Sequence, residues 1–442
     1  MKNALLETYK KRLAVSDAVY GKLHEGEQMS TARKVAVATL LNNVNKIMTP
    51  MNEAFSNSVG TQRADMGEWK KFCLNLTNVA VPSLIAPELV ILYPMTSMTG
   101  YITYIKYTAG SNKGQTKQGD VFNDVFHLGN VDVNYTSQAV VENITAQATE
   151  FVPAWTPVVD GKVELRKSAD SQWEEKTLTS GKVTFSAGTY NAARYKYDNQ
   201  VIPQNDLPIV NAEIDHIAIA AKVRRVAIYY SQLAAFQAKT DYGFNLGDQL
   251  AEKAVGQLKY EIDTEVTDLL IKNAVVDPDL KFNKTVPVGV SKSEHYESFL
   301  EMIEIGRQKI YDATKRFAPN YILIASNVLP IISFIKSFKP APAGSINGPY
   351  FAGTLNSLKV FVTPNIAPST FVMGVNGDDM MSSAAVYAPY MPIVPTQLLG
   401  MADGAMSQGF STAYGLEMLN KNLLVAGTVV AEPQVVPTKE QN

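Results

Sequence analysis

The sequence predicts an α+β fold organised around one long amphipathic helix, which we place at residues 245–274. Three observations support this class. Apolar residues follow a helical period in that stretch, the period changes to two after Leu92, and short strands and helices are mixed between residues 277 and 400.

The long helix has one apolar side, and its charged residues occupy the remaining positions. We expect Asp248 to be the N-cap, and Lys272 falls in the last turn, where a cation suits the helix dipole. A helix of roughly 25 residues is about 40 Å long, which suits an elongated subunit better than a compact enzyme. The apolar side comprises Leu250, Ala254, Leu258, Ile262 and Val266, widened by Ala251, Val255, Leu269 and Leu270.

The N-terminal region is predicted to form two helices, at residues 5–23 and 30–57, with an interruption near Pro50. The apolar stripe of the second helix has no obvious partner among the neighbouring segments. We therefore expect residues 1–75 to form an arm that lies on another surface.

Residues 101–107 are β-branched and aromatic and read as a strand, whereas the polar, glycine-bearing stretch 109–119 reads as a flexible loop. Further strands are predicted at residues 131–135, 140–149 and 217–230. Turn signals and short alternating strands predict a small β-module at residues 151–205.

The C-terminal half reads as a mixed α/β unit. Helices are predicted at residues 295–315 and 327–338, and strands at residues 321–326, 359–363, 370–374, 384–394 and 407–424. The expected organisation is an arm (1–75), a unit with the long helix (76–100, 245–276 and 401–430), an extended loop (101–244) that contains the β-module (151–205), a second α/β unit (277–400) and a loose tail (431–442).

The composition excludes several classes of function. A net charge of -2, from 40 basic and 42 acidic side chains, argues against a dedicated nucleic-acid binder, so any contact with DNA should be weak and non-specific. Cys73 is the only cysteine, which favours a reducing compartment and a core position. The N-terminus is charged where a signal peptide is apolar, and no apolar run reaches the ~18 residues of a membrane span. We expect a soluble protein made inside a cell.

No constellation of catalytic, cofactor-binding or metal-binding residues is evident. The four histidines, His24, His127, His216 and His295, stand far apart, which favours surface or structural roles. Gly110 and Gly114 are too close together for a phosphate-binding loop. The acidic pairs at 277/279 and 378/379 lie beside turn-forming residues. The sequence therefore predicts a protein that is not an enzyme and has no cofactor.

Five short motifs, in order between residues 78 and 422, carry a family resemblance. They are Pro94-Met95 with Thr99-Gly100; Ala221-Lys222 with Arg224, Tyr230-Ser231 and Leu233; Ile324-Ala325-Ser326-Asn327-Val328; Phe351-Ala352-Gly353 with Tyr387-Ala388-Pro389-Tyr390; and Thr412 with Tyr414-Gly415. Together they resemble the major capsid protein of tailed bacteriophages, and more closely its T-even myovirus branch.

The resemblance implies the Hong Kong ninety-seven capsid fold: an N-terminal arm, an extended loop, a peripheral domain with the long helix as its spine, and an axial domain. It also implies self-assembly into hexamers and pentamers of an icosahedral shell around double-stranded DNA. The implied partners are other copies of the chain, a scaffold, a portal, a prohead protease and decoration proteins. The implied location is the virion, after synthesis in the host cytoplasm.

Two alternatives stay open at this point. One is a cellular nanocompartment shell of the same fold, which would be expected to lack a long helical arm. The other is an α/β enzyme with its site in residues 277–400, which would need convergent polar residues in a pocket.

The resemblance also points to processing and to contacts between subunits. Leu23-His24-Glu25, followed by Gly26, fits the family's protease preference for an aliphatic residue two before a glutamate, as does Leu5-Leu6-Glu7. Such matches also arise by chance, so both alternatives, a cleaved arm and an uncleaved arm, remain possible at this point. Lys222, Arg224 and Arg225 are expected to meet acidic side chains of a neighbouring subunit, the alternative being a solvated strand face.

Overall fold

The chain divides into two units in the computed structural model. Unit 1 comprises Met1–Tyr101 and Ala218–Asn442, and unit 2 comprises Ile102–Ile217. The structure describes residues 2–23, 26–55, 73–122, 130–168, 170–198, 200, 207–341, 348–377, 379–396, 398–401 and 404–431.

Unit 1 contains two sheets. The five-stranded sheet has the order β1 (Ile91–Leu92), β17 (Ala385–Pro395), β19 (Ala405–Met418) and β10 (Lys222–Ser231), with β18 (Leu399–Gly400) also on β19. The seven-stranded mixed sheet has the order β11 (Val275–Asn283), β20 (Leu424–Val430), β16 (Thr370–Gly374), β12 (Tyr321–Ile324), β15 (Leu358–Val362), β14 (Tyr350–Leu355) and β13 (Phe338–Pro340).

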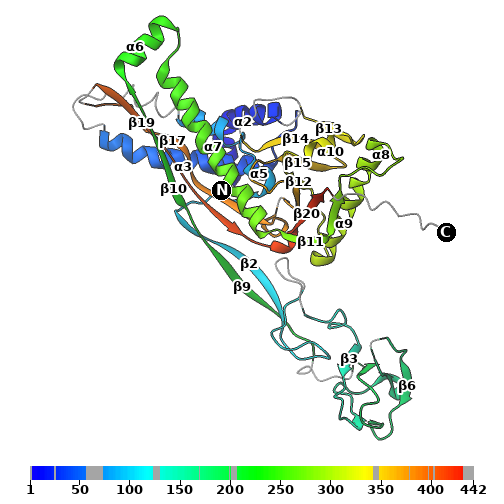
Figure 1. Ribbon diagram of the computed structural model, residues 1–442. Helices are drawn as coiled ribbons and strands as arrows, with labels where there is room; N and C mark the ends of the chain where they lie inside the picture. Colours follow the sequence, from blue (N-terminus) through cyan, green and yellow to red (C-terminus); the bar gives the residue numbers. More distant parts are fainter. Residues whose placement is uncertain are drawn as a thin grey trace, which may run out of the picture. The chain divides into compact units, whose positions relative to one another are not determined.

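The long helix is confirmed as α7 (Leu246–Asn273), which lies alongside β10 and β19 (Figure 1). Its predicted apolar side is buried: Leu258 and Ala254 pack beneath the five-stranded sheet, while Val266 and Leu270 join the large core of the seven-stranded sheet. The N-cap prediction was wrong, because the side chain of Asn245 accepts the hydrogen bond from the backbone N–H of Gly247. Asp248 lies in the first turn instead.

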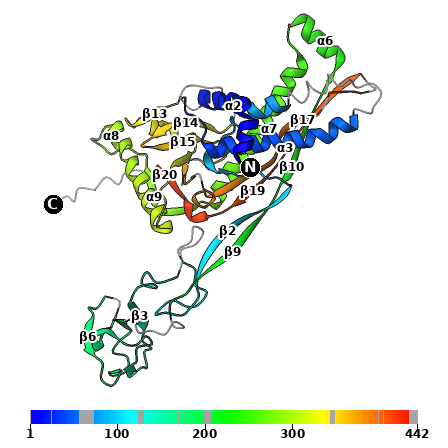
Figure 2. The ribbon, with the colours of Figure 1, turned by 180° about the vertical axis from the view of Figure 1, so that it is seen from behind.

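Unit 1 also contains shorter helices and the helical N-terminal segments. They are α1 (Lys2–Thr8), α2 (Lys10–Leu23), α3 (Thr31–Phe55), a stretch at 73–80, α5 (Ala86–Leu89), α6 (Gln232–Asp241), α8 (Lys292–Glu297), α9 (Phe299–Thr314) and α10 (Leu329–Ser333). α3 runs without a break through the position of Pro50 and lies along β17 (Figure 2).

Three expected boundaries in unit 1 differ from the structure. β17 lies within residues 277–400, yet it pairs with β1 and β19 rather than with the seven-stranded sheet. β20 lies within residues 401–430, yet it pairs with β11 and β16 of that sheet. The helix expected at 327–338 is only α10, because Phe338 already pairs with Leu355 in β13 and β14. Each difference arises from pairing between segments that are distant in sequence.

Unit 2 is a ribbon that carries a small β-module. The ribbon pairs β2 (Thr99–Ala109) with β9 (Val210–Ala220). The predicted strand at 217–230 is therefore two strands, because β9 pairs with β2 in the ribbon and β10 pairs with β19 in the five-stranded sheet. The module contains the sheet β3 (Ala139–Asn143), β8 (Ala192–Lys196), β5 (Lys162–Arg166) and β6 (Glu174–Thr177), and the pair β4 (Glu150–Phe151) and β7 (Val183–Thr184).

The module begins earlier than residue 151. Its core includes Val140 of β3, which lies with Val163, Leu165 and Tyr195. Residues 131–135, expected as a strand, form turns instead, in which the carbonyl of Asp132 accepts from the N–H of Tyr135. The predicted α+β class is confirmed, because the chain contains helices together with parallel and antiparallel strand pairs.

Candidate functional site

The described residues hold no group of three or more His, Cys, Asp or Glu side chains placed to bind a metal ion. Asp277 and Asp279 both pair with Lys309, at 3.1 and 2.7 Å. The N–H of Asp279, together with Lys309, holds the pKa of Asp277 below its ordinary value. His295 bonds through Nε2 to the carbonyl of Asn283 at 2.7 Å. His24, His127 and Asp378 lie outside the described residues. In the part of the chain that the structure describes, no helix is long and apolar enough to cross a membrane.

The stretch around Gly110 to Lys117 is not a phosphate loop. Lys113 and Thr116 exchange backbone hydrogen bonds at 3.0 Å, which closes a tight turn. Gly114 in that turn has a φ of +60°, and a Cβ there would lie 2.6 Å from the carbonyl oxygen of Val141. The turn therefore packs closely against β3, so the expectation of a flexible loop was wrong for these residues.

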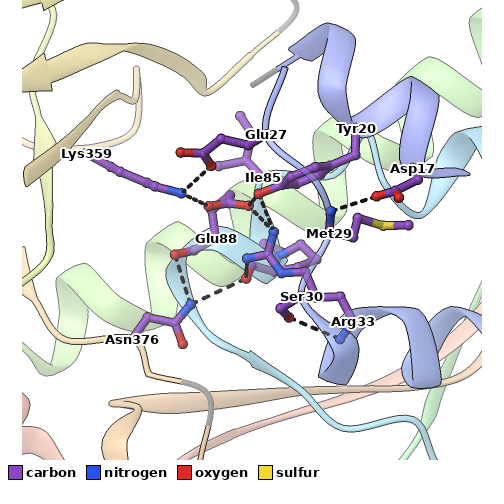
Figure 3. A network of polar contacts seen from close by, with 12 residues as sticks. Asp17, Tyr20, Glu27, Met29, Ser30, Arg33, Ile85, Glu88, Lys359 and Asn376 are labelled. Atoms are coloured by element: carbon purple, nitrogen blue, oxygen red, sulfur yellow. Dashed lines mark hydrogen bonds and ion pairs between the residues drawn. The ribbon is translucent and has the colours of Figure 1, made fainter. Parts of the chain in front are cut away.

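A buried carboxylate joins the N-terminal helices to the rest of unit 1 (Figure 3). The side chain of Glu88 in α5 is only 3% exposed. It pairs with the guanidinium of Arg33 in α3, accepts from the hydroxyl of Tyr20 in α2 at 2.9 Å, and lies 2.8 Å from the ammonium of Lys359 in β15. Glu27 lies on the same ammonium at 3.8 Å. These side chains line a cavity of about 520 Å³.

The electrostatics of this cluster favour the charged pair. Burial by itself would lower the pKa of Arg33, but the charge of Glu88 raises it above the ordinary value. Burial and the same carboxylate raise the pKa of the Tyr20 hydroxyl. Tyr20 therefore acts as a neutral donor, and Arg33 also donates to the carbonyl of Pro87 at 2.5 Å. Residues of three elements, α2, α3 and β15, thus converge on one carboxylate.

The apolar stripe of the second N-terminal helix, for which the neighbouring segments of the sequence offer no obvious partner, packs against distant residues of its own chain. Leu40, Leu41 and Val44 of α3 are fully buried and pack with Cys73 and Val394. Asn43 of α3 donates through Nδ2 to the carbonyls of Met95 and Tyr390, at 2.7 and 3.0 Å. The described part of the arm is therefore ordered within one subunit, because its stripe matches the apolar side of β17.

The candidate cleavage position lies between α2 and α3. Glu25 is outside the described residues, but Gly26 is exposed and its N–H donates to the carbonyl of Gly21 at 2.8 Å. On one side, α2 is attached through Ser16 to the carbonyl of Asn78. On the other, α3 is attached to the rest of unit 1 through Arg33 and Asn43. It also contacts α2, because Arg33 donates to the hydroxyl of Tyr20 at 2.9 Å. Glu7, the second candidate, is exposed inside α1.

The three basic residues of β10 differ in their exposure and their partners. Arg224 pairs with Glu261 and Glu265 of α7, at 3.2 and 2.5 Å, so its acidic partners belong to the same chain. Lys222 and Arg225 are exposed. The alternation of side chains along a strand separates Arg225 from Arg224, leaving Lys222 and Arg225 as the candidates for contacts with a neighbour.

The ribbon of unit 2 has one apolar and one polar face. On the polar face, Tyr104 donates to Asp215 at 3.1 Å and Lys106 lies 3.5 Å from Glu213. On the other face, Ile105, Tyr107 and Ile214 are 48%, 51% and 75% exposed. An isolated pair of strands is marginally stable in water, so this apolar face is a candidate contact surface.

Sequence reasoning missed Glu88, Asp263 and Lys113, which are all buried charged side chains. For Glu88 a signal existed, since an acidic residue inside the apolar run 84–92 needs a partner when that run is buried. For Lys113 there was none, because its surroundings in sequence are polar.

Comparison with known proteins adds sequence matches over most of the chain. The family model described as major capsid protein Gp23 matches residues 66–439. The major capsid protein of Serratia phage KSP90 is 21% identical over 451 residues, covering 96% of this chain and 92% of that protein. The major capsid protein of Enterobacteria phage T4 is 22% identical over 401 residues, covering 78% of this chain and 74% of that protein.

Solved structures show a more distant likeness. A structure from Mycobacterium phage Bobi has a TM-score of 0.41 at 10% identity and covers 79% of this chain and 91% of its own. The capsid of Myoviridae phage XM1 has a TM-score of 0.39 at 7% identity and covers 77% of this chain and 90% of its own. At such TM-scores the family assignment stands on the sequence matches.

Proposed function

The chain belongs to the major capsid protein Gp23 family, and we propose how its surfaces act in the head of a tailed phage. As a major capsid protein it associates with copies of itself into the shell of the virion. The family match favours this function over a nanocompartment shell or an α/β enzyme with a site in residues 277–400. We infer that the copies are arranged as hexamers and pentamers of an icosahedral shell around double-stranded DNA.

The observation that carries the assembly mechanism is the exposed apolar face of the ribbon. Ile105, Tyr107 and Ile214 are exposed while the opposite face is satisfied by cross-strand polar pairs. Covering apolar surface contributes roughly 25 cal/mol per Å². We infer that another copy of the chain covers this face, and that each added subunit thereby orders a ribbon.

Hydrogen exchange of dissociated subunits and assembled shells tests this mechanism. Amides at 101–109 and 210–220 should exchange faster in the subunits than in the shells, whose formation is followed by electron microscopy. The matched control is β12, which is buried in its own unit and should be equally protected in both. Equal protection of the ribbon in both states contradicts the mechanism.

We propose that the exposed residues Lys222 and Arg225 of β10 help to align neighbouring subunits with one another. A rim charge of this kind changes the association rate and its salt dependence more than the affinity. Arg225→Glu should slow assembly, most strongly at low salt. Arg224→Ala is the matched control, because it breaks pairs inside the chain and should instead lower the stability of the subunit. Equal assembly rates for Arg225→Glu and the unmodified chain contradict the proposal.

Processing after Glu25 is also a proposal. It is supported by the exposure of Gly26 between two helices that each make contacts of their own with the rest of unit 1. Cleavage would break the covalent link between α3 and the helices α1 and α2, which include Tyr20. α3 would keep its hydrogen bonds to Pro87 and Met95. The intact mass of the chain in mature virions decides, since a chain that begins at Gly26 is expected and one that begins at Met1 contradicts cleavage.

The remaining partners follow from membership of the family. We propose that the chain is made in the host cytoplasm and contacts a scaffold, a portal, a prohead protease and decoration proteins. A net charge of -2 supports only weak, non-specific contact with the packaged DNA. The family is structural, and we infer that the chain has neither a catalytic role nor a cofactor.

A further inference from the structure

Unit 2 contains a buried lysine whose charge is met by carbonyl groups. Lys113 is 3% exposed. Its ammonium donates to the carbonyl oxygens of Asn134, Tyr135 and Ser137, at 3.2, 2.7 and 2.5 Å. An ammonium has three N–H donors, so these carbonyls match its full donor set.

Two aromatic rings complete the surroundings of this ammonium. Its nitrogen lies 5.0 Å from the ring centroid of Tyr197 and 5.8 Å from that of Trp155. Ring faces attract cations at such distances. Burial lowers the pKa of Lys113 to about 8, and the nearby Asp132 opposes this shift. The ammonium is therefore the main form at neutral pH.

The carbonyl groups converge because residues 132–137 form consecutive turns. The N–H of Tyr135 donates to the carbonyl of Asp132, and the N–H of Ser137 to that of Asn134, both at 3.0 Å. The hydroxyl of Thr116 accepts from the N–H of Asp132 at 2.9 Å. The loop 110–119 thus meets this turn through a charge and a hydroxyl, and its side chains supply almost no apolar surface.

We propose that the carbonyls of residues 134, 135 and 137, with the rings of Trp155 and Tyr197, form a binding site for a primary alkylammonium, which Lys113 occupies from within the chain. Lys113 is a positioning residue: its ammonium holds loop 110–119 on the β-module. The site distinguishes ammonium ions by their number of N–H donors. A quaternary ammonium can stack on the rings but has no N–H group to donate to the carbonyls.

Chemical rescue in the full chain tests this site. Lys113→Ala removes the atoms that n-propylammonium would restore. Without the amine, amides at 110–119 and 130–138 should exchange about tenfold faster or more, since their local opening no longer breaks the ammonium contacts. Adding n-propylammonium chloride should restore most of the protection. Potassium chloride and tetramethylammonium chloride at the same ionic strength should not.

Two further variants separate the effect of the Lys113 charge from the effect of its side-chain packing and from the effect of changing any lysine in this loop. Lys113→Met keeps a long apolar side chain, and should show the same fast exchange without rescue, because the methionine fills the path of the amine. Lys117→Ala changes an exposed lysine of the same loop and should leave exchange unchanged. Peptides from β3, β5 and β8 report whether the module remains folded.

Three results would overturn the proposal. They are unchanged exchange in Lys113→Met, equal restoration of Lys113→Ala by tetramethylammonium, and no restoration by n-propylammonium while β5 and β8 stay protected. If Lys113→Ala loses protection throughout unit 2, refolding in n-propylammonium but not in potassium chloride is expected, and failure of that refolding counts against the site.

Discussion

Asp263 is a buried carboxylate in the middle of α7, and it makes stability depend on pH. It accepts hydrogen bonds from the backbone N–H groups of Ile85 and Ala86, at 3.0 and 2.9 Å. Burial raises its pKa from 3.8 to about 7, against the opposing effects of these bonds and of Lys259. Because the folded state binds this proton more tightly than the unfolded state, the contribution to stability is largest below pH 4 and is lost as the pH rises to about 7.

We expect Asp263→Asn to remove this dependence. The amide oxygen can accept both backbone bonds without a buried charge, so the free energy of unfolding should change less between about pH 5 and 8 than in the unmodified chain. Asp263→Ala leaves two buried N–H groups without acceptors and should cost about 1–3 kcal/mol for each at either pH. Urea denaturation at both pH values measures the difference. An unchanged pH dependence in Asp263→Asn would show that the carboxylate is not the titrating group.

Glu88 links the N-terminal helices to the rest of unit 1 through its contacts with Arg33, Tyr20 and Lys359. Glu88→Gln keeps the shape but leaves Arg33 and Lys359 without their shared carboxylate. Breaking one member of a buried ion pair costs about 3–5 kcal/mol, and thermal denaturation of the subunit should show a loss of this size. Glu297→Gln is the matched control, since its partner Lys336 is 81% exposed. Similar losses for both variants would contradict a special role for Glu88.

Among the secondary-structure elements, the start of α7 contains two polar residues whose roles differ. Asn245 is the N-cap, whereas Asp248 lies in the first turn, where its charge suits the helix dipole. Asn245→Ala should cost about 1 kcal/mol of stability. Asp248→Ala should have a smaller effect that salt reduces further. Denaturation curves at low and high salt compare the two, and a larger loss for Asp248→Ala would reverse the assignment.

In the chain as a whole, the part of unit 2 beyond the ribbon should be removable, but only at the right boundary. The N–H of Gly110 donates to the carbonyl of Ile209 at 2.7 Å, so the two ends are adjacent. Replacing residues 112–208 by an Asn-Gly turn should close a hairpin and leave unit 1 soluble and folded. Circular dichroism and thermal denaturation of the shortened chain measure this outcome.

Deletion of residues 151–205, the module boundaries predicted from the sequence, is the matched comparison for the deletion of 112–208. Its removal deletes β8 and β5 while leaving β3, whose Val140 is only 2% exposed in the intact module. We expect that variant to expose the module core and to aggregate. A soluble, folded chain after removal of 151–205, together with an insoluble one after removal of 112–208, would reverse our assignment of the boundary.

Local sequence patterns were sufficient to predict the elements whose signal is long and continuous. The helix at 245–274 and the strands at 359–363 and 370–374 follow from periodicity and residue type. Cys73 is buried, as expected from its apolar neighbours. The order of five short motifs predicted a capsid family, and the family match confirms it.

Tertiary contacts, in contrast, determine which elements pair and which charges meet. β17 pairs with β19 and β20 pairs with β16, although their residues were expected to belong to the other part of the chain in each case. Glu88, Asp263 and Lys113 have partners that lie up to 271 residues away in the sequence. The physical reason is that strand pairing and the compensation of buried charge depend on contacts between distant segments. A periodicity measured over a few residues shows that a face is buried, but it does not show what covers that face.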